Sequence, residues 1–427
     1  MDPLFPLAAF VATLFATRRS LGMGLGVAVG VGYVNGVVRA NYLSVWTTFM
    51  FDAAILGLYA GFLARPDSAG VWRSPLGKWV TVLTLWPAAL TLLPVNDYLV
   101  QLVALRATVW YLPVALIAAK LTAADLTTVT RLLAGWNLLS LAGGLYTFAY
   151  GIETLYPENA VTELMYRSKD VAGGNYRVPS TFLNAHQYGG TMGMSLAFLL
   201  GRLLQSRVGG WERTWLALGV VAAAGGVLLC AARLPVVIAA FTLVAGWVLS
   251  GFSPRLGLVV GCLAVAAAYL ATSDERLQRF QSLDDAEALA GRLHGSANAE
   301  FLDLFARYPL GAGMGSAVGT SIPFFLADRA PEPVGLENEY SRILVDQGWI
   351  GLGLWLGFLV WLYGRRPRAG TDWRLGVLIM YACSGVTWAT AGLGTGTLSS
   401  VPGSVVVLIQ MGIVARHRPA AGRPDPR

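Results

Sequence analysis

The feature that most constrains this chain is a series of apolar runs, each about as long as a helix that crosses a bilayer. Such a helix needs about 20 predominantly apolar residues, and runs of that order recur from residue 4 to residue 415 with Arg-bearing connections between them. Hydrophobic residues make up 55% of the chain and charged residues only 13%. These proportions exclude a soluble enzyme or a DNA-binding protein and indicate an integral membrane protein.

We therefore predict an all-α polytopic protein in which residues 1–427 form a single membrane domain. Twelve or thirteen spans are expected, depending on whether the short first run crosses. The expected spans are 4–17, 21–38, 44–64, 76–93, 98–119, 126–149, 187–204, 213–231, 233–250, 254–272, 340–363, 373–392 and 396–415. The first residues do not resemble a signal peptide, because Arg18 and Arg19 follow the apolar stretch instead of preceding it.

The distribution of Lys and Arg predicts how these spans face. The net charge is +7, but the cations lie at the ends of apolar runs, so no nucleic-acid partner is expected. Alternating spans put four basic clusters on one side, which the positive-inside rule makes cytoplasmic. The first outer loop (150–186) and the large outer loop (273–339) then face outward, and residues 417–427 form a disordered cytoplasmic tail. The basic clusters are Arg65, Arg73 and Lys78; Arg202, Arg207 and Arg213; Arg365, Arg366, Arg368 and Arg374; and Arg416, Arg418, Arg423 and Arg427.

Several other patterns argue against metal sites, disulfides, a phosphate-binding loop and an inverted-repeat transporter. The three cysteines lie within apolar runs and lack CxxC spacing, so neither a zinc site nor a disulfide framework is expected. Asp284 and Asp285 have no neighbours that complete a coordination shell, so we expect no metal and no other cofactor. The glycines between Gly22 and Gly32 follow no strand, which favours close helix packing over a phosphate cradle. No internal repeat is visible, so an inverted-repeat transporter is not supported.

Arg233 is a costly polar residue at the boundary of the predicted membrane region. It lies between two apolar runs in AARLPVVIAA, with no other charge between Arg213 and Arg255. An Arg at helix-centre depth costs about 2.5–3.5 kcal/mol, and less near the interface. One interpretation is an interfacial side chain that reaches the lipid headgroups. The other is an anion site, because the guanidinium fork matches two oxygens of a phosphate.

The large outer loop is far longer than a connection between two spans requires, which is typical of functional loops. An apolar residue recurs there every four positions, which predicts an amphipathic helix. A turn with three glycines follows in PLGAGMG and could bring backbone N–H groups close to a ligand. The apolar stripe is Leu289, Leu293, Ala297, Phe301 and Phe305. The polar side chains off the stripe, either solvated or functional, are Arg292, His294, Glu300, Asp303 and Arg307.

Polar residues crowd the start of the apolar run in GLENEYSRILVDQGWIG. They are Glu337, Asn338, Glu339, Tyr340 and Arg342. Capping and the helix dipole explain one carboxylate at such a position. They do not explain two carboxylates beside an Asn at the outer mouth where Arg233 and Arg292 are expected.

A second polar helix start lies in FLNAHQYGG, where Asn184, His186 and Gln187 enter the membrane region. A hydrogen-bonded structural His is the alternative to a catalytic one.

Three further charged residues, Asp52, Asp97 and Arg106, lie in or beside apolar runs, and Asp97 could pair with Arg106.

Four motifs, in this order, resemble the O-antigen ligase and O-antigen polymerase superfamily of bacterial membrane glycosyltransferases. FLNAHQYGG is similar to the family's Asn-rich segment, and AARLPVVIAA to its Arg-bearing helix start. GRLHGSANAEFLDLFARYPLGAGMG is similar to its Gly-Arg stretch and Pro-Leu-Gly-x-Gly turn, and ENEYSRILVDQGWIGL to its His-Asn-x-Tyr-Leu segment. The resemblance covers the layout of nearly the whole chain and implies a GT-C-like membrane fold.

Carried over to this chain, the resemblance makes Arg233 and Arg292 the two functional arginines. The family's catalytic His falls at Glu337, a departure that favours a polymerase, or another acceptor, over a strict ligase. A carboxylate can also act as general base, so we expect Glu337 in that role, with Glu339 in reserve. His186 and His294 could also supply an imidazole. The substrate-binding candidates are Asn184, His186, Gln187, His294, Asn338, Glu339, Tyr340 and Arg342.

The reaction that the resemblance implies is metal-independent, inverting transfer of a glycan from undecaprenyl diphosphate to an acceptor sugar hydroxyl. It would take place at the periplasmic face of the bacterial inner membrane. Arginines would stabilise the charge that grows on the diphosphate leaving group, where losing one preorganised donor costs about 2.7–4 kcal/mol of barrier. Implied partners are the lipid-linked donor, a glycan or lipid A-core acceptor and membrane lipid, with a chain-length regulator left open.

Two other classes of protein are alternatives. A transporter or flippase of a lipid-linked or anionic solute would use the same arginines for binding alone, and it predicts charges spread through the bilayer midplane. A membrane scaffold would use the large outer loop as a docking surface and has no need of Arg233 at the boundary. The charges of this chain gather at the outer face, which favours the transferase.

Overall fold

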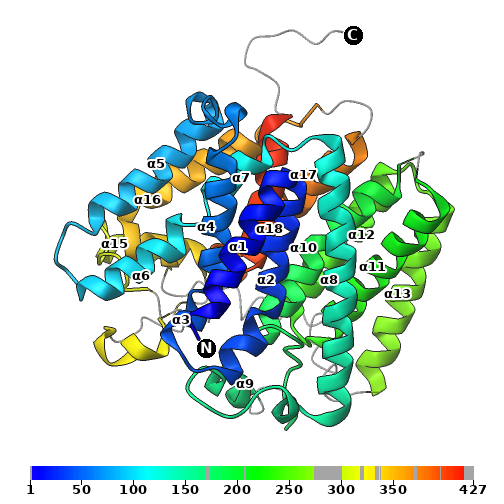
Figure 1. Cartoon of the computed structure of the whole chain (residues 1–427), viewed down its shortest axis with the longest axis horizontal. Helices are drawn as coiled ribbons and strands as arrows, with labels where there is room; N and C mark the ends of the chain where they lie inside the picture. The colour runs from blue at the N-terminus through cyan, green and yellow to red at the C-terminus, as the bar shows by residue number, and fades with distance from the viewer. Residues whose placement is uncertain are drawn as a thin grey trace.

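The structure is a computed structural model that describes residues 2–168, 174–205, 208–273, 301–317, 322–331, 336, 338–368, 373–394 and 396–417. Within these residues every regular element is a helix, as the sequence predicts (Figure 1). The longer helices are α1 (Leu4–Arg19), α2 (Leu21–Asn41), α4 (Met50–Leu63), α5 (Pro75–Leu90), α6 (Tyr98–Val109), α8 (Ala123–Tyr150), α10 (Ala185–Leu203), α11 (Gly210–Leu229), α12 (Arg233–Leu249), α13 (Pro254–Ser273), α16 (Glu339–Tyr363), α17 (Arg374–Ala389) and α18 (Gly403–Arg416). The short ones are α3 (Val45–Thr48), α7 (Pro113–Ala118), α9 (Glu163–Arg167), α15 (Phe301–Arg307) and the 3₁₀ turns η1 (Pro66–Ser68), η2 (Val71–Arg73), η3 (Ile152–Thr154), η8 (Phe324–Arg329) and η9 (Thr390–Leu393).

Each of the thirteen predicted spans overlaps at least one of these helices. In the described part of the chain, six segments are long and apolar enough to cross a membrane: Leu21–Asn41, Tyr98–Ala118, Ala123–Tyr150, Gly210–Leu229, Glu339–Tyr363 and Arg374–Gly392. Four apolar helical segments are shorter: Met50–Leu63, Arg233–Leu249, Leu256–Ala266 and Gly403–Arg416. The fold is therefore that of a polytopic helical membrane protein, and the total of twelve or thirteen spans stays a prediction.

The observed helices differ from the predicted spans at three places. The segment expected at 44–64 is interrupted at Phe49, which separates α3 from α4. α6 ends at Val109, and α7 begins at Pro113, whose missing N–H suits the first turn of a helix. α18 begins only at Gly403, because residues 396–402 form turns instead of the helix expected from 396.

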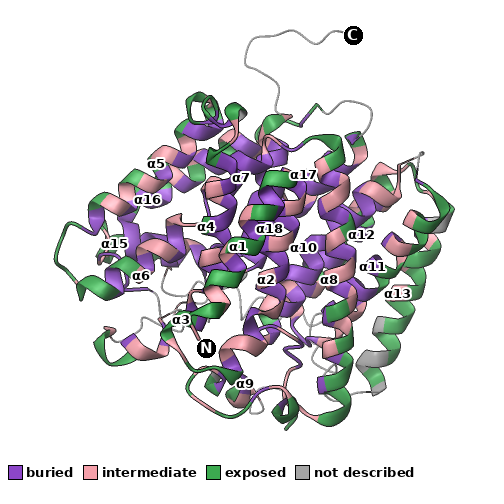
Figure 2. Cartoon of the chain, in the orientation of Figure 1, coloured by how far each residue is buried: buried purple, intermediate pink, exposed green. Residues whose placement is uncertain are grey.

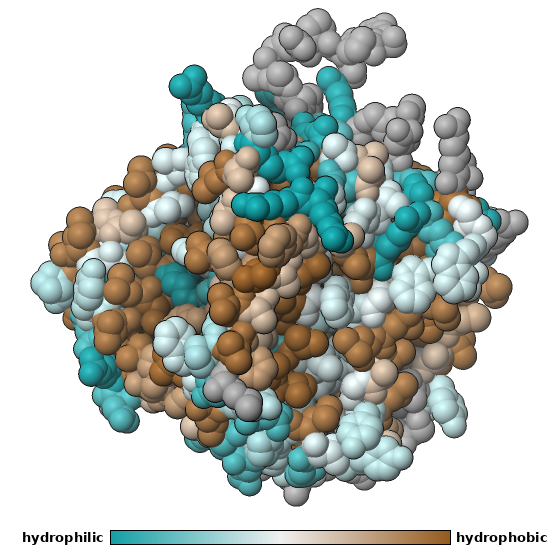
Figure 3. Space-filling model, viewed as in Figure 1, coloured by the Kyte–Doolittle hydropathy of each residue, from teal (hydrophilic) through white to brown (hydrophobic). Residues whose placement is uncertain are grey.

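The surface has the pattern expected of a protein in a bilayer. Hydrophobic side chains form a broad band across the middle of the face in Figure 3, with hydrophilic side chains gathered above and below it. Figure 2 shows buried residues concentrated at the centre, around α10 and α18, and exposed residues along α13 at one edge. α10 is buried from Thr191 to Gly201, so this helix forms the axis of the core.

Glycines allow α2 and α8 to pack closely, as the glycine pattern predicts. A Cβ at Gly22, Gly26 or Gly30 would lie 2.3 Å from an atom of α8. Asp125 fixes the ends of both helices, because its side chain completes the capping box of α8 and accepts a 3.0 Å hydrogen bond from the N–H of Gly22.

Polar side chains also join the helices inside the core. Tyr33 Oη donates to Asn137 Oδ1 at 2.7 Å, and Asn137 Nδ2 donates to Ser195 Oγ at 2.8 Å. These two bonds connect α2, α8 and α10, and such bonds between helices satisfy polar groups where no water is present.

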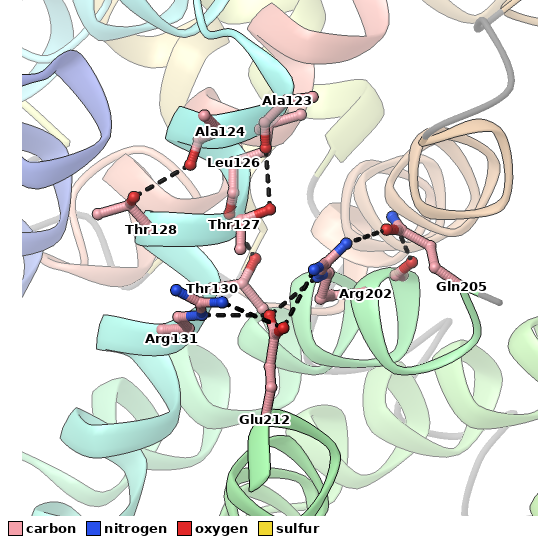
Figure 4. A network of polar contacts seen from close by, with 11 residues as sticks. Ala123, Ala124, Leu126, Thr127, Thr128, Thr130, Arg131, Arg202, Gln205 and Glu212 are labelled. Atoms are coloured by element: carbon pink, nitrogen blue, oxygen red, sulfur yellow. Dashed lines mark hydrogen bonds and ion pairs between the residues drawn. The ribbon is translucent and has the colours of Figure 1, made fainter. Parts of the chain in front are cut away.

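Basic segments meet at the end of the molecule where α18 ends, at the top of Figure 1. Arg202 and Arg131 both bond to Glu212, at 3.0–3.1 Å, and so join α10 and α8 to the start of α11 (Figure 4). The backbone N–H of Arg368 donates to His417 O at 2.7 Å, and Arg416 donates to Leu121 O. Three of the expected cytoplasmic connections thus lie together.

Candidate functional site

α16 is a broken helix, and the break is built from two sequence motifs. Gly348 has a φ of 68° and a ψ of −169°, which are not helical values. The N–H of Trp349 therefore bonds to Pro309 O at 2.9 Å, while Val345 O, its helical partner, accepts from the N–H of Ala312 at 2.6 Å. The PLGAGMG turn is thus inserted into the backbone ladder of the helix.

Left-handed glycines shape this turn. Gly311, Gly313 and Gly315 have φ values of 84°, 91° and 93°, which only glycine adopts without strain. Asp346 holds the end of the turn, because its buried Oδ1 accepts from the N–H of Ala317 at 3.0 Å. The sequence indicates a flexible turn that could bring N–H groups close to a ligand. In the structure the N–H groups of Gly311 and Ala312 bond to Tyr308 O and Val345 O.

The first turn of α16 contains a buried ion pair. Glu339 is 0% exposed, and its Oε1 accepts hydrogen bonds from Nε and Nη2 of Arg342, the Nε bond being 3.2 Å long. Its Oε2 accepts from the N–H of Gly396 at 2.7 Å. Both oxygens of Glu339 therefore already have donors.

The neighbours of this pair stabilise the helix start. Asn338 is the N-cap of α16, and its side-chain oxygen accepts from the N–H groups of Tyr340 and Ser341 at 2.8 and 3.3 Å. Tyr340 Oη donates to Trp388 O at 2.6 Å, which ties the same turn to the end of α17.

Arg233 is the first residue of α12 and is half-buried. A turn containing Ala231, with the left-handed φ of 51°, reverses the chain between α11 and α12 and so brings Arg233 to the helix start. The next residue, Leu234, packs on the segment that follows η9, because a Cβ at Gly394 would lie 3.0 Å from Leu234 Cδ2. Gly396 of that segment bonds to Glu339, so Arg233 starts its helix close to the start of α16.

Asn184 and His186 lie at the start of α10. Asn184 is the N-cap and accepts from the N–H of Gln187 at 2.9 Å. His186 is exposed, and its Nε2 lies 3.2 Å from Nη1 of Arg177. Arg177 is also within electrostatic range of Cys230, which precedes Arg233 by one short turn.

Arg177 was missed by the sequence reasoning. It lies in a polar loop, in YRVPST, where no periodicity marks a residue as buried or functional. Its only signal is that it is a cation shortly before FLNAHQYGG. Arg177, Arg233 and Arg342 now form a basic region where α10, α12 and α16 begin.

A second polar cluster corrects a predicted pairing. Arg106 does not pair with Asp97; it donates to both oxygens of Asp52, Nε at 2.6 Å and Nη2 at 2.5 Å. Asp97 instead caps α6 and lies 3.6 Å from Arg329. A cap lies more than two helical turns from Arg106, a distance too great for the two side chains.

Three predicted site residues, Glu337, Arg292 and His294, lie outside the described residues. So does most of the predicted amphipathic stripe. Of its described part, Phe305 stacks on Trp349 with ring centroids 4.9 Å apart, while Leu304 is the buried residue of α15.

In the described part of the chain, no group of three or more His, Cys, Asp or Glu side chains could hold a metal ion. No known protein-family model matches the sequence, and no curated protein matches it. The chemistry of the site is therefore inferred from the geometry of its residues alone.

Proposed function

We propose that this chain is a membrane glycosyltransferase of the O-antigen ligase and polymerase type, with a GT-C-like fold. It transfers a glycan from undecaprenyl diphosphate to an acceptor sugar hydroxyl at the periplasmic face of a bacterial inner membrane. Inversion at the anomeric carbon and a polymerase reaction are part of the proposal.

The observation that carries this proposal is the gathering of cations at three helix starts. These groups come from segments far apart in the sequence. Contacts through Leu234, Gly394 and Gly396 connect the start of α12 with the Glu339–Arg342 pair. The start of α10, where Arg177 meets His186, packs on the turn before α12, because a Cβ at Gly189 would lie 2.2 Å from Cys230 Sγ. A diphosphate leaving group needs fixed cations of this kind, because they stabilise its growing charge without reorganisation.

The roles can be divided among the residues by their contacts. Arg233 is half-buried and therefore open enough to meet a ligand, and we assign it to the diphosphate, with Arg292 as its partner from the large outer loop. Arg342 is buried against Glu339, so we assign it to holding the start of α16 in place.

The general base is proposed to be Glu337. Glu339, the reserve candidate, already accepts hydrogen bonds from Arg342 and from Gly396. The hydroxyl of an acceptor sugar could therefore transfer its proton to Glu339 only by displacing one of these donors. Glu337 precedes the N-cap Asn338 and is therefore adjacent to the helix start that carries the other polar groups.

A transporter or flippase of a lipid-linked or anionic solute is the second candidate. The break of α16 at Gly348 favours it, because discontinuous helices line the solute sites of many transporters. In this chain the break is filled by the PLGAGMG turn, which takes up the freed backbone groups.

The proposal is tested with purified protein in detergent, an undecaprenyl-diphosphate oligosaccharide and EDTA, with glycan length as the readout. Wild type is expected to lengthen the glycan. Arg233→Ala is expected to reduce the rate about 100-fold or more, Arg233→Lys less, and Glu337→Gln to abolish transfer. Arg213→Ala, an exposed Arg in the first turns of α11, is the matched control and should transfer at the wild-type rate.

Two results would contradict the proposal. Undiminished transfer by folded Arg233→Ala would remove the assigned site. Failure of wild type with this donor and with lipid A-core, together with Arg233-dependent binding of the donor, would establish the transporter instead.

A further inference from the structure

Arg39 is a basic residue with an unsatisfied donor, outside the site described above. It lies in the last turn of α2, is half-buried, and its Nε–H is buried without a hydrogen-bond acceptor among the described residues. Among the described residues, the groups within electrostatic range of Arg39 are Arg106, Asp52 and Tyr111.

The one carboxylate of this cluster is already occupied. Both oxygens of Asp52 accept from Arg106, and Oδ1 also accepts from Tyr111 Oη at 3.1 Å. Two guanidinium groups thus share one carboxylate, which leaves one positive charge without a counterion inside the cluster. A charge at the membrane boundary is costly unless it is paired.

The cluster holds Arg106 in a fixed position. Tyr111 Oη accepts from Arg106 Nη2 at 3.1 Å, and the guanidinium lies over the ring of Phe49, 5.3 Å from its centroid. The Arg106 side chain is still 24% exposed, so a ligand can reach it.

The location is the same end of the molecule as the candidate site. The N–H of Val37 bonds to Thr181 O at 3.3 Å, and a Cβ at Gly36 would lie 2.2 Å from the backbone of Phe182. The end of α2 therefore packs on the segment that leads to Asn184 and His186. Asp52 is in the first turn of α4, at that same end.

We propose that Arg39 and Arg106 form a binding site for a phosphate group carried by a lipid. The free guanidinium of Arg39 supplies paired donors that match two phosphate oxygens, and Arg106, held by Asp52 and Tyr111, supplies the second charge. The phosphate comes either from a phospholipid headgroup or from a polyprenyl diphosphate. This site is separate from Arg233 and does not depend on the proposed transfer reaction.

The first experiment measures the thermal unfolding temperature in detergent with inorganic pyrophosphate as the probe, at constant ionic strength. It is carried out in wild type and in an Arg233→Ala background, which removes binding at the other arginine. Pyrophosphate is expected to raise Tm, and Arg39→Gln is expected to abolish the part of the rise that remains in the Arg233→Ala background. Arg39→Lys should retain part of it, and Arg213→Gln, an exposed Arg at the opposite end, all of it.

The same experiment separates binding from a merely structural role. Without pyrophosphate, Arg39→Gln should unfold at the wild-type temperature or above, because it removes an uncompensated charge. An equal rise in Tm in Arg39→Gln and its parent would overturn the proposal. A Tm of Arg39→Gln that lies below that of its parent by the same amount with and without pyrophosphate would also overturn it.

A second experiment identifies the source of the phosphate. Affinities for phosphatidylglycerol and for undecaprenyl diphosphate are measured by native mass spectrometry of the detergent-solubilised protein. Arg39→Gln is expected to weaken the binding of one of them at least tenfold, and that lipid is the ligand. Unchanged affinity for both would overturn the proposal. Because no turnover is involved, failure of the transfer assay leaves this result unaffected.

Discussion

Asp346 of α16 accepts a hydrogen bond from the backbone N–H of Ala317 at 3.0 Å, across 29 positions of sequence. The bond fastens the PLGAGMG turn beside the break at Gly348, where the turn exchanges backbone bonds with the helix. Two motifs that are separate in the sequence, PLGAGMG and the middle of α16, thereby form one structural unit.

Because α16 is broken at Gly348, adding a single methyl group at this position should strongly destabilise the protein. A Cβ there would lie 2.5 Å from the carbonyl carbon of Leu310, and the left-handed φ adds strain. We expect Gly348→Ala to cost about 3 kcal/mol or more. Gly353→Ala in the same helix, where a Cβ meets nothing within 4 Å, should be neutral or stabilising by up to about 1 kcal/mol. Thermal unfolding in detergent compares the two, and equal effects would contradict this account of the break.

The Asp346–Ala317 bond predicts a difference between two substitutions. Asp346→Ala leaves a buried N–H without an acceptor and is expected to cost about 1–3 kcal/mol. Asp346→Asn keeps an acceptor oxygen and should cost less. Hydrogen exchange at the Ala317 amide is the direct measurement: protection should be lost in Asp346→Ala and largely kept in Asp346→Asn. Unchanged protection in both would show that the bond does not hold the turn.

The Glu339–Arg342 pair predicts a non-additive result in a double-mutant cycle. Arg342→Gln leaves the buried carboxylate of Glu339 without its cation, at an expected cost of about 3–5 kcal/mol. Adding Glu339→Gln should recover a large part of that cost, because the uncompensated charge is then gone. The exposed pair of Glu163 and Arg167 on α9 is the control, where Glu163→Gln should change stability by about 0.5 kcal/mol or less. Additive effects at Glu339 and Arg342 would rule out a mutually dependent pair.

His417 predicts a weak acid sensitivity at the opposite end. Burial first, and then the neighbouring charge of Arg416, lower the pKa of His417 below its usual value. The unfolded chain therefore binds the proton more readily, and the free energy of unfolding falls as the pH drops through the usual range of imidazole, from about 7 towards 5. Tm should decrease more between pH 7.5 and pH 5.5 in wild type than in His417→Gln. An equal decrease in Tm in the two proteins would mean that protonation of His417 does not lower the free energy of unfolding.

Several conclusions followed from the sequence alone because they depend on neighbouring residues. Runs of about 20 apolar residues predict helices at the right places, and Asn184 and Asn338 lie where helices begin, since capping is decided within four residues. The expected packing role of the glycines in α2 also holds, because small residues spaced along one helical face leave room for a partner.

The partners across the fold could not be predicted in this way. Arg106 pairs with Asp52 of α4 and not with Asp97, although Asp97 is closer in sequence. The fold brings the first turn of α4 within reach of the Arg106 side chain, whereas the cap of α6 lies too far along the helix. The position of Arg177 is set by tertiary structure, because its loop lies against the start of α10 and the turn before α12.

The sequence by itself therefore determined an all-helical membrane protein with polar helix starts, since hydrophobic length and helix capping are local properties. Only the tertiary structure decided that PLGAGMG fills the break in α16, that Glu339 holds Gly396, and that Arg39 is left beside an occupied carboxylate. These pairings depend on which helices become neighbours, and that is set by packing among many apolar surfaces that look alike in the sequence.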